Sequence, residues 1–520
     1  MENRSRVVNP AVSAWPCWDS ESPAHLAHIW SIKMSTGAPP SLQYLAMQSL
    51  LSDQALAISA LEDLPLLLFP SLFMEVYCGG HTEVLKALVQ AWPLPCLPLG
   101  DLAESPDLQT FKAVLDGLNL LLAKKERPSR WKLQVLNLRK EHPNIWIQGY
   151  PSMARLSFLD VLTDKPRESH CSGMTEEQPL MIAMDLTIRG YAENDLQAHL
   201  LQWASERKEQ VHLCSRQLQI LTSSISEIQK ALRMVRLDSI QELVVSEFWL
   251  QRSLRMFTPY LGQMKNLRSL TCSSMCGDFF THSQYSWVVG EQLGQLQHLQ
   301  ELHVHDVFIL NVNVPAILRS LRPLKALSLS ACALQEADLR FLFQCPCTRQ
   351  LQHLRLRTLL MRNAELLRAL LWQVAGTLET LALEECYITD AQLSAILPTL
   401  SQCSQLRFFS FYGNHISLAA LQNLLSHTAK MGHLRRGLYP APLESYSPEV
   451  GFERNFDPER FAEVGAALVQ TLRDVGTNQK VQICTNFCHR QNRCQIYSLT
   501  LDGSWAVTKE GLPGFPALPM

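Results

Sequence analysis

The chain has 520 residues, of which 47% are hydrophobic and 18% are charged, as in an ordinary globular protein. Its net charge of −2 argues against a surface for nucleic acids or anionic membranes. The longest apolar runs, such as Leu64–Phe69, are far shorter than a bilayer span, and the N-terminus lacks the basic flank and apolar core of a signal peptide. We therefore expect no membrane partner and no direct nucleic-acid partner.

The 15 cysteines form an odd set without a legible secretion signal. This predicts reduced thiols in a cytoplasmic protein and leaves a nuclear fraction open. Near the end of the chain, Cys484, Cys488, His489 and Cys494 have the spacing C-x₃-C-H-x₄-C, which is not a common zinc-finger spacing. We expect free buried thiols there and no cofactor or metal, although the spacing alone leaves metal binding open.

In chain order, residues 1–40 show no periodicity and are predicted to be a disordered tail. Apolar residues at helical spacing then continue from Ser41 to about Arg127. They predict one helix near Leu42–Leu50, apolar helical sequence from Leu56 to Leu72, and helices over Glu83–Trp92 and Leu108–Ala123. Residues 41–130 are thus expected to form a helical N-terminal cap.

A first L-x-x-L-x-L pattern follows in Trp131–Lys140 and predicts the first strand of a repeat array. Residues 141–178 are polar and are predicted to be a weakly ordered insertion. Degenerate repeats are expected at Met184/Leu186/Ile188 and at Leu213/Leu218/Ile220. The array is therefore predicted over residues 131–438, degenerate over 131–236 and regular over 237–430.

The regular part repeats L-x-x-L-x-L between Ile240 and Ile416. The copies are Ile240/Leu243/Val245, Leu267/Leu270/Cys272, Leu299/Leu302/Val304, Leu324/Leu327/Leu329, Leu351/Leu354/Leu356, Leu378/Leu381/Leu383 and Leu406/Phe409/Phe411. Their first positions are 27, 32, 25, 27, 27 and 28 residues apart, and a leucine-rich repeat is roughly 20–29 residues long. In three copies an Asn or Cys follows, at Cys332, Cys386 and Asn414, where its side chain can satisfy the backbone groups of a turn.

This period predicts an α/β fold, a leucine-rich repeat solenoid (horseshoe) with a parallel concave sheet. After Ile416 we expect a helix over Leu418–Ala429, another over Pro458–Arg473 and a strand over Val481–Cys484. Residues 439–520 are predicted to be a C-terminal cap and tail. Typical enzymatic motifs are missing, including the P-loop, G-x-S-x-G and H-E-x-x-H, so we expect a protein that is not an enzyme.

Several longer segments resemble the PRAME family (preferentially expressed antigen in melanoma) of leucine-rich repeat proteins, over about residues 41–490. The segments are Ser49–Leu51, Ala55–Ile58, Leu68–Pro70, Val89–Pro93, Phe111–Leu118, Arg130–Leu138, Leu237–Ile240, Pro259–Met264, Cys403–Leu406, Ser410–Asn414 and Tyr439–Tyr446. The resemblance implies a substrate receptor of a cullin-2 RING ubiquitin ligase, recruited through elongin C with elongin B. It also implies repression of transcription and differentiation, negative regulation of apoptosis and promotion of cell proliferation.

Two short motifs match the adaptor role that the resemblance implies. An elongin-binding box has Leu-x-x-x-Cys-x-x-x-aliphatic on one helix, and Leu42, Ala46 and Leu50 have this spacing, with Ala in place of Cys. Residues four apart form one ridge that can enter an apolar groove. A cullin-2 box fits Leu64, Pro65, Leu68 and Leu72. The alternative is that these residues only pack the cap.

A nuclear-receptor box, L-x-x-L-L, occurs at Leu64–Leu68, Leu118–Leu122, Leu367–Leu371 and Leu421–Leu425. A docking helix must expose these leucines, whereas we expect the cap and the repeats to bury them. A second general hypothesis therefore stays beside the ligase: a repeat scaffold or transcriptional corepressor that acts without a cullin.

The protein substrate is unknown, and it is expected on the concave sheet. Because a strand alternates, the residues on either side of the second leucine should face outward there. The candidates for substrate binding are His303, His305, His353, Arg355, Arg357, Glu384, Phe408 and Tyr412. The smaller neighbours Ala326, Ser328, Ala382 and Ser410 are expected on the same face. Arg and Tyr are frequent anchors in protein interfaces, although concave residues can also be merely solvated.

Overall fold

The computed structural model describes residues 41–100, 102, 108–124, 130–140, 145–156, 179–190, 195–246, 251–273, 291–305, 321–332, 334, 336–447, 455–485, 494–500 and 502–510. The predicted tail 1–40, most of the insertion 141–178, Cys488 and His489 lie outside these residues. The chain divides into two compact units, residues 1–185 with 194–214 and residues 186–193 with 215–520. The finer division at residues 130, 236 and 438 stays a prediction.

Helices make up most of the first unit, as the helical spacing of its sequence predicts. They are α2 (Leu42–Leu51), α3 (Gln54–Ser59), α4 (Phe69–Cys78), α5 (Thr82–Gln90), α6 (Leu108–Leu122), α7 (Ile145–Gln148), α8 (Tyr150–Met153) and α10 (Asp195–Ser205), with the 3₁₀ helices η1 (Ala60–Glu62) and η2 (Leu66–Leu68). Helices α5 and α6 pack closely because Gly117 has no side chain: a Cβ there would lie 2.8 Å from the Lys86 carbonyl oxygen.

Aromatic side chains form the core of this unit. The ring of Phe73 lies 5.3 Å from that of Trp92 and 5.4 Å from that of Trp146. Both indoles are anchored, since Trp92 Nε1 donates to the Cys96 carbonyl at 3.0 Å and Trp146 Nε1 donates to the Pro98 carbonyl at 2.8 Å. Burial of such large rings contributes much of the stability of a small helical unit.

A small parallel sheet completes the first unit. Four strands of this sheet belong to the first unit, in the order β1 (Cys96–Pro98), β2 (Val135–Asn137), β3 (Leu180–Ala183) and β5 (Val211–Cys214). The strand predicted to be first, in Trp131–Lys140, is β2, and β1 precedes it. The sequence pattern missed β1 because its segment is rich in proline. Proline is tolerated at Pro98 because β1 is an edge strand.

One sheet of thirteen described strands runs through the second unit. Its parallel strands are β4 (Leu186–Arg189), β6 (Gln217–Leu221), β8 (Glu242–Ser246), β9 (Ser269–Ser273), β10 (Glu301–His305), β11 (Ala326–Ser330), β12 (His353–Arg357), β13 (Thr380–Glu384), β14 (Phe408–Ser410), β15 (Arg436–Pro440) and β16 (Lys480–Cys484). An antiparallel hairpin of β17 (Gln495–Leu499) and β18 (Trp505–Glu510) ends the sheet.

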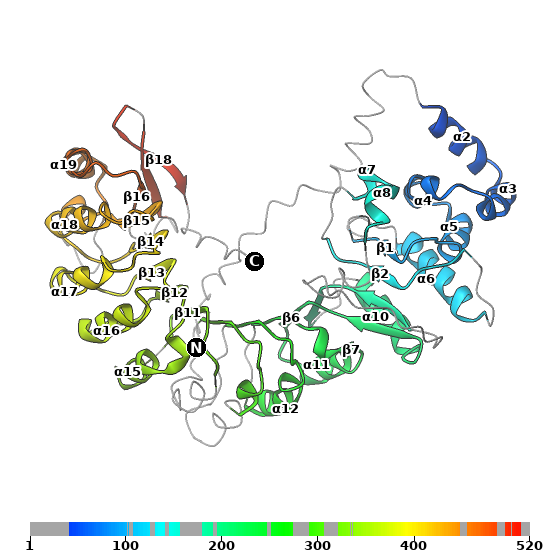
Figure 1. The fold of residues 1–520 in the computed structure, drawn as a ribbon, viewed down its shortest axis with the longest axis horizontal. Helices are drawn as coiled ribbons and strands as arrows, with labels where there is room; N and C mark the ends of the chain where they lie inside the picture. The colour runs from blue at the N-terminus through cyan, green and yellow to red at the C-terminus, as the bar shows by residue number, and fades with distance from the viewer. Residues whose placement is uncertain are drawn as a thin grey trace, which may run out of the picture. The chain divides into compact units, whose positions relative to one another are not determined.

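Helices follow the strands of the second unit in turn. The described helices are α11 (Ile225–Leu232), α12 (Gln251–Leu261), α15 (Glu336–Gln344), α16 (Ala364–Val374), α17 (Asp390–Leu400), α18 (Leu418–Thr428) and α19 (Pro458–Val475), with the 3₁₀ helices η3 (Leu237–Ser239), η6 (Pro346–Thr348) and η7 (Leu443–Ser445). The short strand β7 (Val235–Arg236) lies between α11 and η3 in the sequence. Figure 1 shows α15 to α19 in a row on one side of strands β11 to β16. This unit is the predicted α/β repeat solenoid.

The parallel register confirms the predicted stacking of the repeats. The second apolar residue of each copy pairs with its equivalent on the next strand, in the row Leu243, Leu270, Leu302, Leu327, Leu354, Leu381 and Phe409. These side chains are buried, so each repeat shares its apolar surface with both neighbours.

A tight turn ends several strands at the same repeat position. Ala331, Thr358 and Glu385 have φ of 50°, 50° and 53°, and Gly413 has φ of 75°. A left-handed backbone costs a non-glycine residue roughly 1–2 kcal/mol. Hydrogen bonds offset this cost, since the amides of Ala331, Thr358 and Glu385 each donate to a carbonyl of the next repeat at 2.9–3.0 Å.

The predicted Asn and Cys positions satisfy the backbone of these turns. Asn414 Oδ1 accepts from the amides of Cys386 and Ile388 at 3.1 Å, while Nδ2 donates to the carbonyls of Leu383 and Phe411. In the repeat before, the Cys386 thiol donates to two carbonyls at 3.3 Å. Burial raises the pKa of this thiol to about 12, so it remains a protonated donor.

The C-terminal region continues the same sheet. Helix α19 and strand β16 match the predictions for Pro458–Arg473 and Val481–Cys484, whereas β15, β17 and β18 were not predicted. Strand β15 contains Gly437 and Pro440, which are weak strand formers, so only pairing with its neighbours reveals it. The hairpin packs on α19 through Trp505, whose Nε1 donates to the Gly465 carbonyl at 3.0 Å. Among the helices that the structure describes, none is long and apolar enough to cross a membrane.

We predict that Leu354→Ala destabilises the second unit by roughly 2–5 kcal/mol, because it removes a fully buried side chain from the middle of the leucine row and leaves a cavity. Denaturant unfolding followed by circular dichroism measures this change. The matched control is Leu360→Ala, which removes an exposed leucine and should shift the free energy of unfolding by about 0.5 kcal/mol or less. Equal effects of the two changes would contradict the shared leucine row.

Candidate functional site

The first candidate site is a group of exposed apolar side chains on the first unit, which we name the leucine surface. It consists of Leu42 and Leu45 on α2, Leu56 and Ile58 on α3, and Leu66 and Leu67 on η2. Leu42 is 85% exposed and Leu67 is 63% exposed. Helix α2 packs on α3, and α3 packs on η1 and α5. Figure 1 shows α2 and α3 at one end of the first unit.

Two of the three residues predicted to bind elongin are accessible. Leu42 and Ala46 are exposed and Leu50 is half-buried, while Met47 and Leu51 attach the other face of α2 to the unit. The helix starts at Ser41, whose hydroxyl oxygen accepts from the Tyr44 amide at 3.1 Å. The i, i+4, i+8 ridge predicted from the spacing thus exists, with its first two positions free of packing.

The residues predicted to bind cullin-2 are divided between surface and core. Pro65 is exposed, Leu64 and Leu68 are half-buried, and Leu72 on α4 is only 1% exposed. Sequence reasoning missed Leu66 and Leu67, which are the exposed leucines of this segment. The reason is local: η2 is a 3₁₀ helix with three residues per turn, so a spacing of four does not keep leucines on one ridge.

Arg130 holds the segment that carries Leu66 and Leu67. Its guanidinium donates to the carbonyl oxygens of Leu61 at 3.0 Å and Leu64 at 2.8 Å. These contacts span 69 and 66 residues of sequence, and no local pattern could have predicted them. They satisfy two carbonyls at a point where the backbone leaves helical geometry.

The second candidate site is the polar side of strands β10 to β14, which we name the inner cluster. Its members are His303, His305, His353, Arg355, Arg357, Glu384, Glu385 and Ser410. The register places His303, Ser328, Arg355, Ala382 and Ser410 side by side in one row across the sheet. The predicted row of outward-facing residues is therefore present in the backbone.

A buried ion pair lies at the centre of the inner cluster. Arg355 donates from Nε and a terminal nitrogen to one oxygen of Glu384, at 3.0 and 2.8 Å. The other carboxylate oxygen accepts from the Ser410 hydroxyl at 2.8 Å. A second, more accessible pair joins Arg357 to Glu385 at 3.2 Å, and Thr358 donates to the same carboxylate at 3.0 Å. Sequence reasoning placed Ser410 on this face but selected neither Glu385 nor Thr358.

The histidines of the inner cluster are half-buried and partly bonded. His353 Nδ1 lies 2.9 Å from the Thr380 hydroxyl, and His303 lies 3.5 Å from Glu301 and lowers the pKa of that carboxyl by hydrogen bonding. Burial, together with the nearby charges of His303, Arg355 and Arg357, lowers the pKa of His305 to about 4. His305 is therefore neutral at pH 7, which limits the positive charge of the cluster.

The expectation of a uniformly exposed concave face is wrong for several residues. Glu384 is 1% exposed and Tyr412 is 2% exposed, and Phe408 is also buried. So are the small residues Ala326, Ser328, Ala382 and Ser410. Strands lie about 4.8 Å apart, so long side chains extend over their short neighbours on this face. Arg355 does so when it reaches Glu384, and Tyr412 packs with Leu438, Cys484, Cys494 and Ile496.

Other sequence candidates are explained by packing. The leucines of Leu367–Leu371 and Leu421–Leu425 that define the receptor motif are buried, as are Leu118 and Leu121. The copy at Leu64–Leu68 differs because it lies in the leucine surface. Cys484 and Cys494 are buried. Within the residues that the structure describes, no three His, Cys, Asp or Glu side chains gather as metal ligands would.

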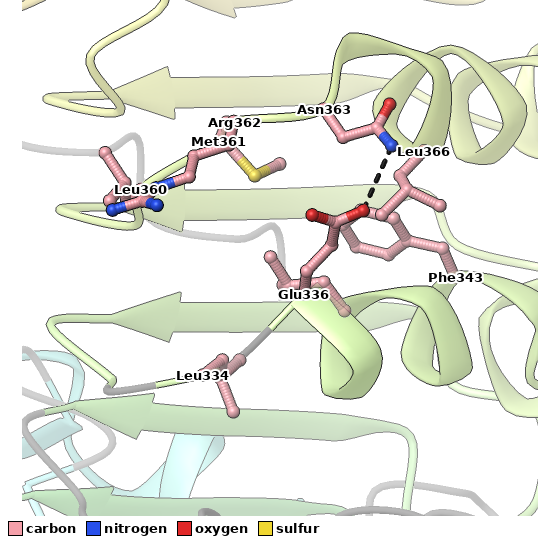
Figure 2. A pocket seen from close by; sticks show the side chains of 9 residues that line it. Leu334, Glu336, Phe343, Leu360, Met361, Arg362, Asn363 and Leu366 are labelled. Atoms are coloured by element: carbon pink, nitrogen blue, oxygen red, sulfur yellow. Dashed lines mark hydrogen bonds between the residues drawn. The ribbon is translucent and has the colours of Figure 1, made fainter.

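A shallow cavity of about 300 Å³ lies beside α15 and α16 (Figure 2). Leu339, Phe343 and Leu366 supply apolar walls, and the Asn363 amide donates to Glu336 at 3.1 Å across it. None of the residues predicted to form a site lines this cavity.

Comparisons with known proteins identify the family. Residues 180–503 match the model of the PRAME C-terminal domain, and residues 39–146 match that of the PRAME N-terminal domain. The chain belongs to the PRAME family. Human PRAME family member 8 is 44% identical over 464 residues, which cover 88% of this chain and 97% of that protein. Human PRAME family member 12 is 44% identical over 464 residues, covering 88% and 95%.

A solved structure of a Bacteroides fragilis protein aligns with this PRAME chain at 13% identity and a TM-score of 0.30. It covers 46% of this chain and 82% of that chain, and at this distance it supports no argument. The two domain matches relate directly to the two candidate sites. The leucine surface lies within the PRAME N-terminal domain, and the inner cluster lies within the PRAME C-terminal domain.

We predict that Arg355→Ala destabilises this PRAME chain by roughly 3–5 kcal/mol, because it leaves the buried Glu384 carboxylate without its cation. The double variant Arg355→Ala/Glu384→Ala should recover part of that loss. Denaturant unfolding of the four proteins in the mutant cycle gives the coupling energy. Arg368→Ala, which removes one partner of an exposed pair with Glu365, is the control and should cost about 1 kcal/mol or less. A coupling energy near zero for Arg355 and Glu384 would contradict the buried pair.

Proposed function

We propose that this PRAME family chain is a non-enzymatic substrate-recognition subunit of a cullin-2 RING ubiquitin ligase. In this proposal the leucine surface binds elongin C, with elongin B, and cullin-2 with its RING subunit, while the inner cluster binds a protein substrate. Ubiquitin transfer is performed by the partners. Repression of transcription and differentiation, negative regulation of apoptosis and promotion of proliferation then follow from loss of the substrate.

The exposure of the leucine surface is the observation that carries the proposal. Leu42 and Leu67 each leave most of a large apolar side chain in water, which a monomer gains nothing by doing. Burying such a side chain in a partner contributes roughly 1.5–3 kcal/mol. A group of exposed leucines on neighbouring short helices fits the mode in which a helix ridge enters an apolar groove. The sequence spacing of both boxes and the family membership point to the same segment.

The inner cluster supports the substrate side of the proposal. His303 on β10 and His353 and Arg357 on β12 lie on the same side of the sheet, with β11 between the two strands. Each of the three side chains is bonded to a neighbouring side chain, which restricts its motion. Pre-ordered polar groups lose little entropy on binding, which favours recognition of a folded or extended protein segment. Soluble partners in the cytoplasm, with a nuclear fraction, agree with this role.

The alternative function is a repeat scaffold or transcriptional corepressor that never binds a cullin. The same inner cluster would then serve as its partner site, and the leucine surface would have another occupant. Binding of purified elongin and cullin components separates the two functions.

We predict that Leu42→Asp reduces binding of the elongin B–elongin C complex at least tenfold, and that Leu67→Asp does so for cullin-2 in the presence of that complex. A carboxylate in an apolar groove must be desolvated without a partner, which costs several kcal/mol. Leu120→Asp is the matched control, because Leu120 is an exposed leucine of the same unit on α6. Calorimetry measures the affinities, and thermal unfolding verifies the fold. Wild-type protein that binds neither component would refute the ligase function.

For the substrate side, we predict that His303→Ala/Arg357→Ala removes substrate capture but leaves elongin binding and stability within about 1 kcal/mol of wild type. Arg357 pairs with a partly exposed glutamate, so its loss costs little. Proximity labelling in cells compares the partners of the two proteins, with Arg368→Ala on α16 as the control. An unchanged set of labelled proteins would place the substrate site elsewhere.

A further inference from the structure

We propose that the partner of the leucine surface presents an apolar groove bordered by lysine and arginine side chains. This inference rests on the proposed function of that surface as a docking site, and it specifies the electrostatic character of the groove. It comes from the charges around the leucines rather than from the leucines themselves.

The segment that forms the leucine surface has an unusual charge distribution. Residues 41–85 contain Asp53, Glu62, Asp63, Glu75 and Glu83 but no Lys or Arg, whereas the whole chain has 46 Lys and Arg in 520 residues. At that frequency a segment of this length would hold about four basic residues. The acidic bias is therefore confined to the part of the chain that exposes its leucines.

Three of these acids alternate with the exposed apolar residues along the sequence. Asp53 lies between Leu45 and Leu56 in sequence, and Glu62 and Asp63 lie between Ile58 and Leu66. All three are exposed, and within the part of the chain that the structure describes none of them forms an ion pair. Asp53 also accepts from the Leu56 amide at 3.1 Å and so caps α3. We name these three carboxylates the acidic rim.

The other charged groups nearby are already engaged. Glu75 accepts from Gln48, and Glu83 pairs with Lys86 at 2.8 Å. Arg130 brings one positive charge against the segment, but its guanidinium donates to the carbonyls of Leu61 and Leu64. The acidic rim therefore keeps its negative field toward solvent.

This field discriminates between possible occupants. In a two-fold dimer through the same surface, each acidic rim would face the other, which like-charge repulsion disfavours. An anionic membrane surface would be repelled in the same way. A protein groove with a basic border would instead gain attraction at its rim while its apolar floor buries the leucines, which is the usual anatomy of a protein interface.

The test compares two variants that lose the same number of acids. Asp53→Asn/Glu62→Gln/Asp63→Asn neutralises the acidic rim with almost no change of shape, and Asn retains the cap of α3. The control, Asp116→Asn/Glu206→Gln/Glu209→Gln, neutralises three exposed acids on or just after α6 and α10 of the same unit. Association rates with the elongin B–elongin C complex, with and without cullin-2, are measured from 20 to 300 mM NaCl.

Wild type and control should associate about tenfold more slowly at the highest salt, because salt screens the steering attraction. The rim variant should be about five- to tenfold slower than wild type at 20 mM NaCl and nearly insensitive to salt. A wild-type rate that does not depend on salt, or equal losses in both variants, overturns the inference while leaving the proposed ligase function intact.

Should wild type bind neither component, the ligase function fails and the inference is tested on the true partner. The photo-crosslinker p-benzoylphenylalanine in place of Leu45 captures that partner in cells. Carbodiimide coupling of the captured complex then joins carboxylates to adjacent lysine amines. Coupling of Glu62 or Asp63 to partner lysines supports a basic border. A captured partner without such links, or a captured second copy of this chain, overturns it.

Discussion

The second unit depends on one constraint: the parallel register that places one apolar side chain of every repeat against its equivalent in the next. A single repeat has too little apolar surface to fold, so burial must be shared. Leu354 is buried because Leu327 and Leu381 lie on either side of it. The turns are part of the same constraint, since a left-handed backbone at residues 331, 358, 385 and 413 allows each strand to end at the same place.

The register also determines where polar chemistry can occur. Side chains alternate along a strand, so fixing the leucines on one side fixes Arg355 and its neighbours on the other. The buried pair of Arg355 and Glu384 adds little net stability, because desolvation offsets most of its attraction, although the loss of one partner is costly. It leaves His303, His353 and Arg357 as the accessible groups of the inner cluster. The sheet thereby holds a small set of ordered, partly accessible polar side chains on one side.

The first unit solves a different physical problem. It has a compact aromatic core around Trp92, yet it keeps Leu42 and Leu67 in solvent. Exposed leucines increase the risk of non-specific association, and the acidic rim reduces that risk because copies of the surface repel one another. In the proposed complex, the apolar ridge and the negative border select a partner whose groove has a basic border. In this proposal, one set of residues controls both docking and solubility.

The sequence alone determined the solenoid, the register of its leucines and the roles of Cys386 and Asn414, because these depend on local periodicity that every repeat restates. It also located the segment of the leucine surface. Only the tertiary structure decided which side chains remain accessible: Leu72 is in the core, Leu67 is outside, and Glu384 is covered by Arg355. Exposure depends on contacts between distant residues, such as Arg130 with Leu64, and no local pattern encodes such contacts.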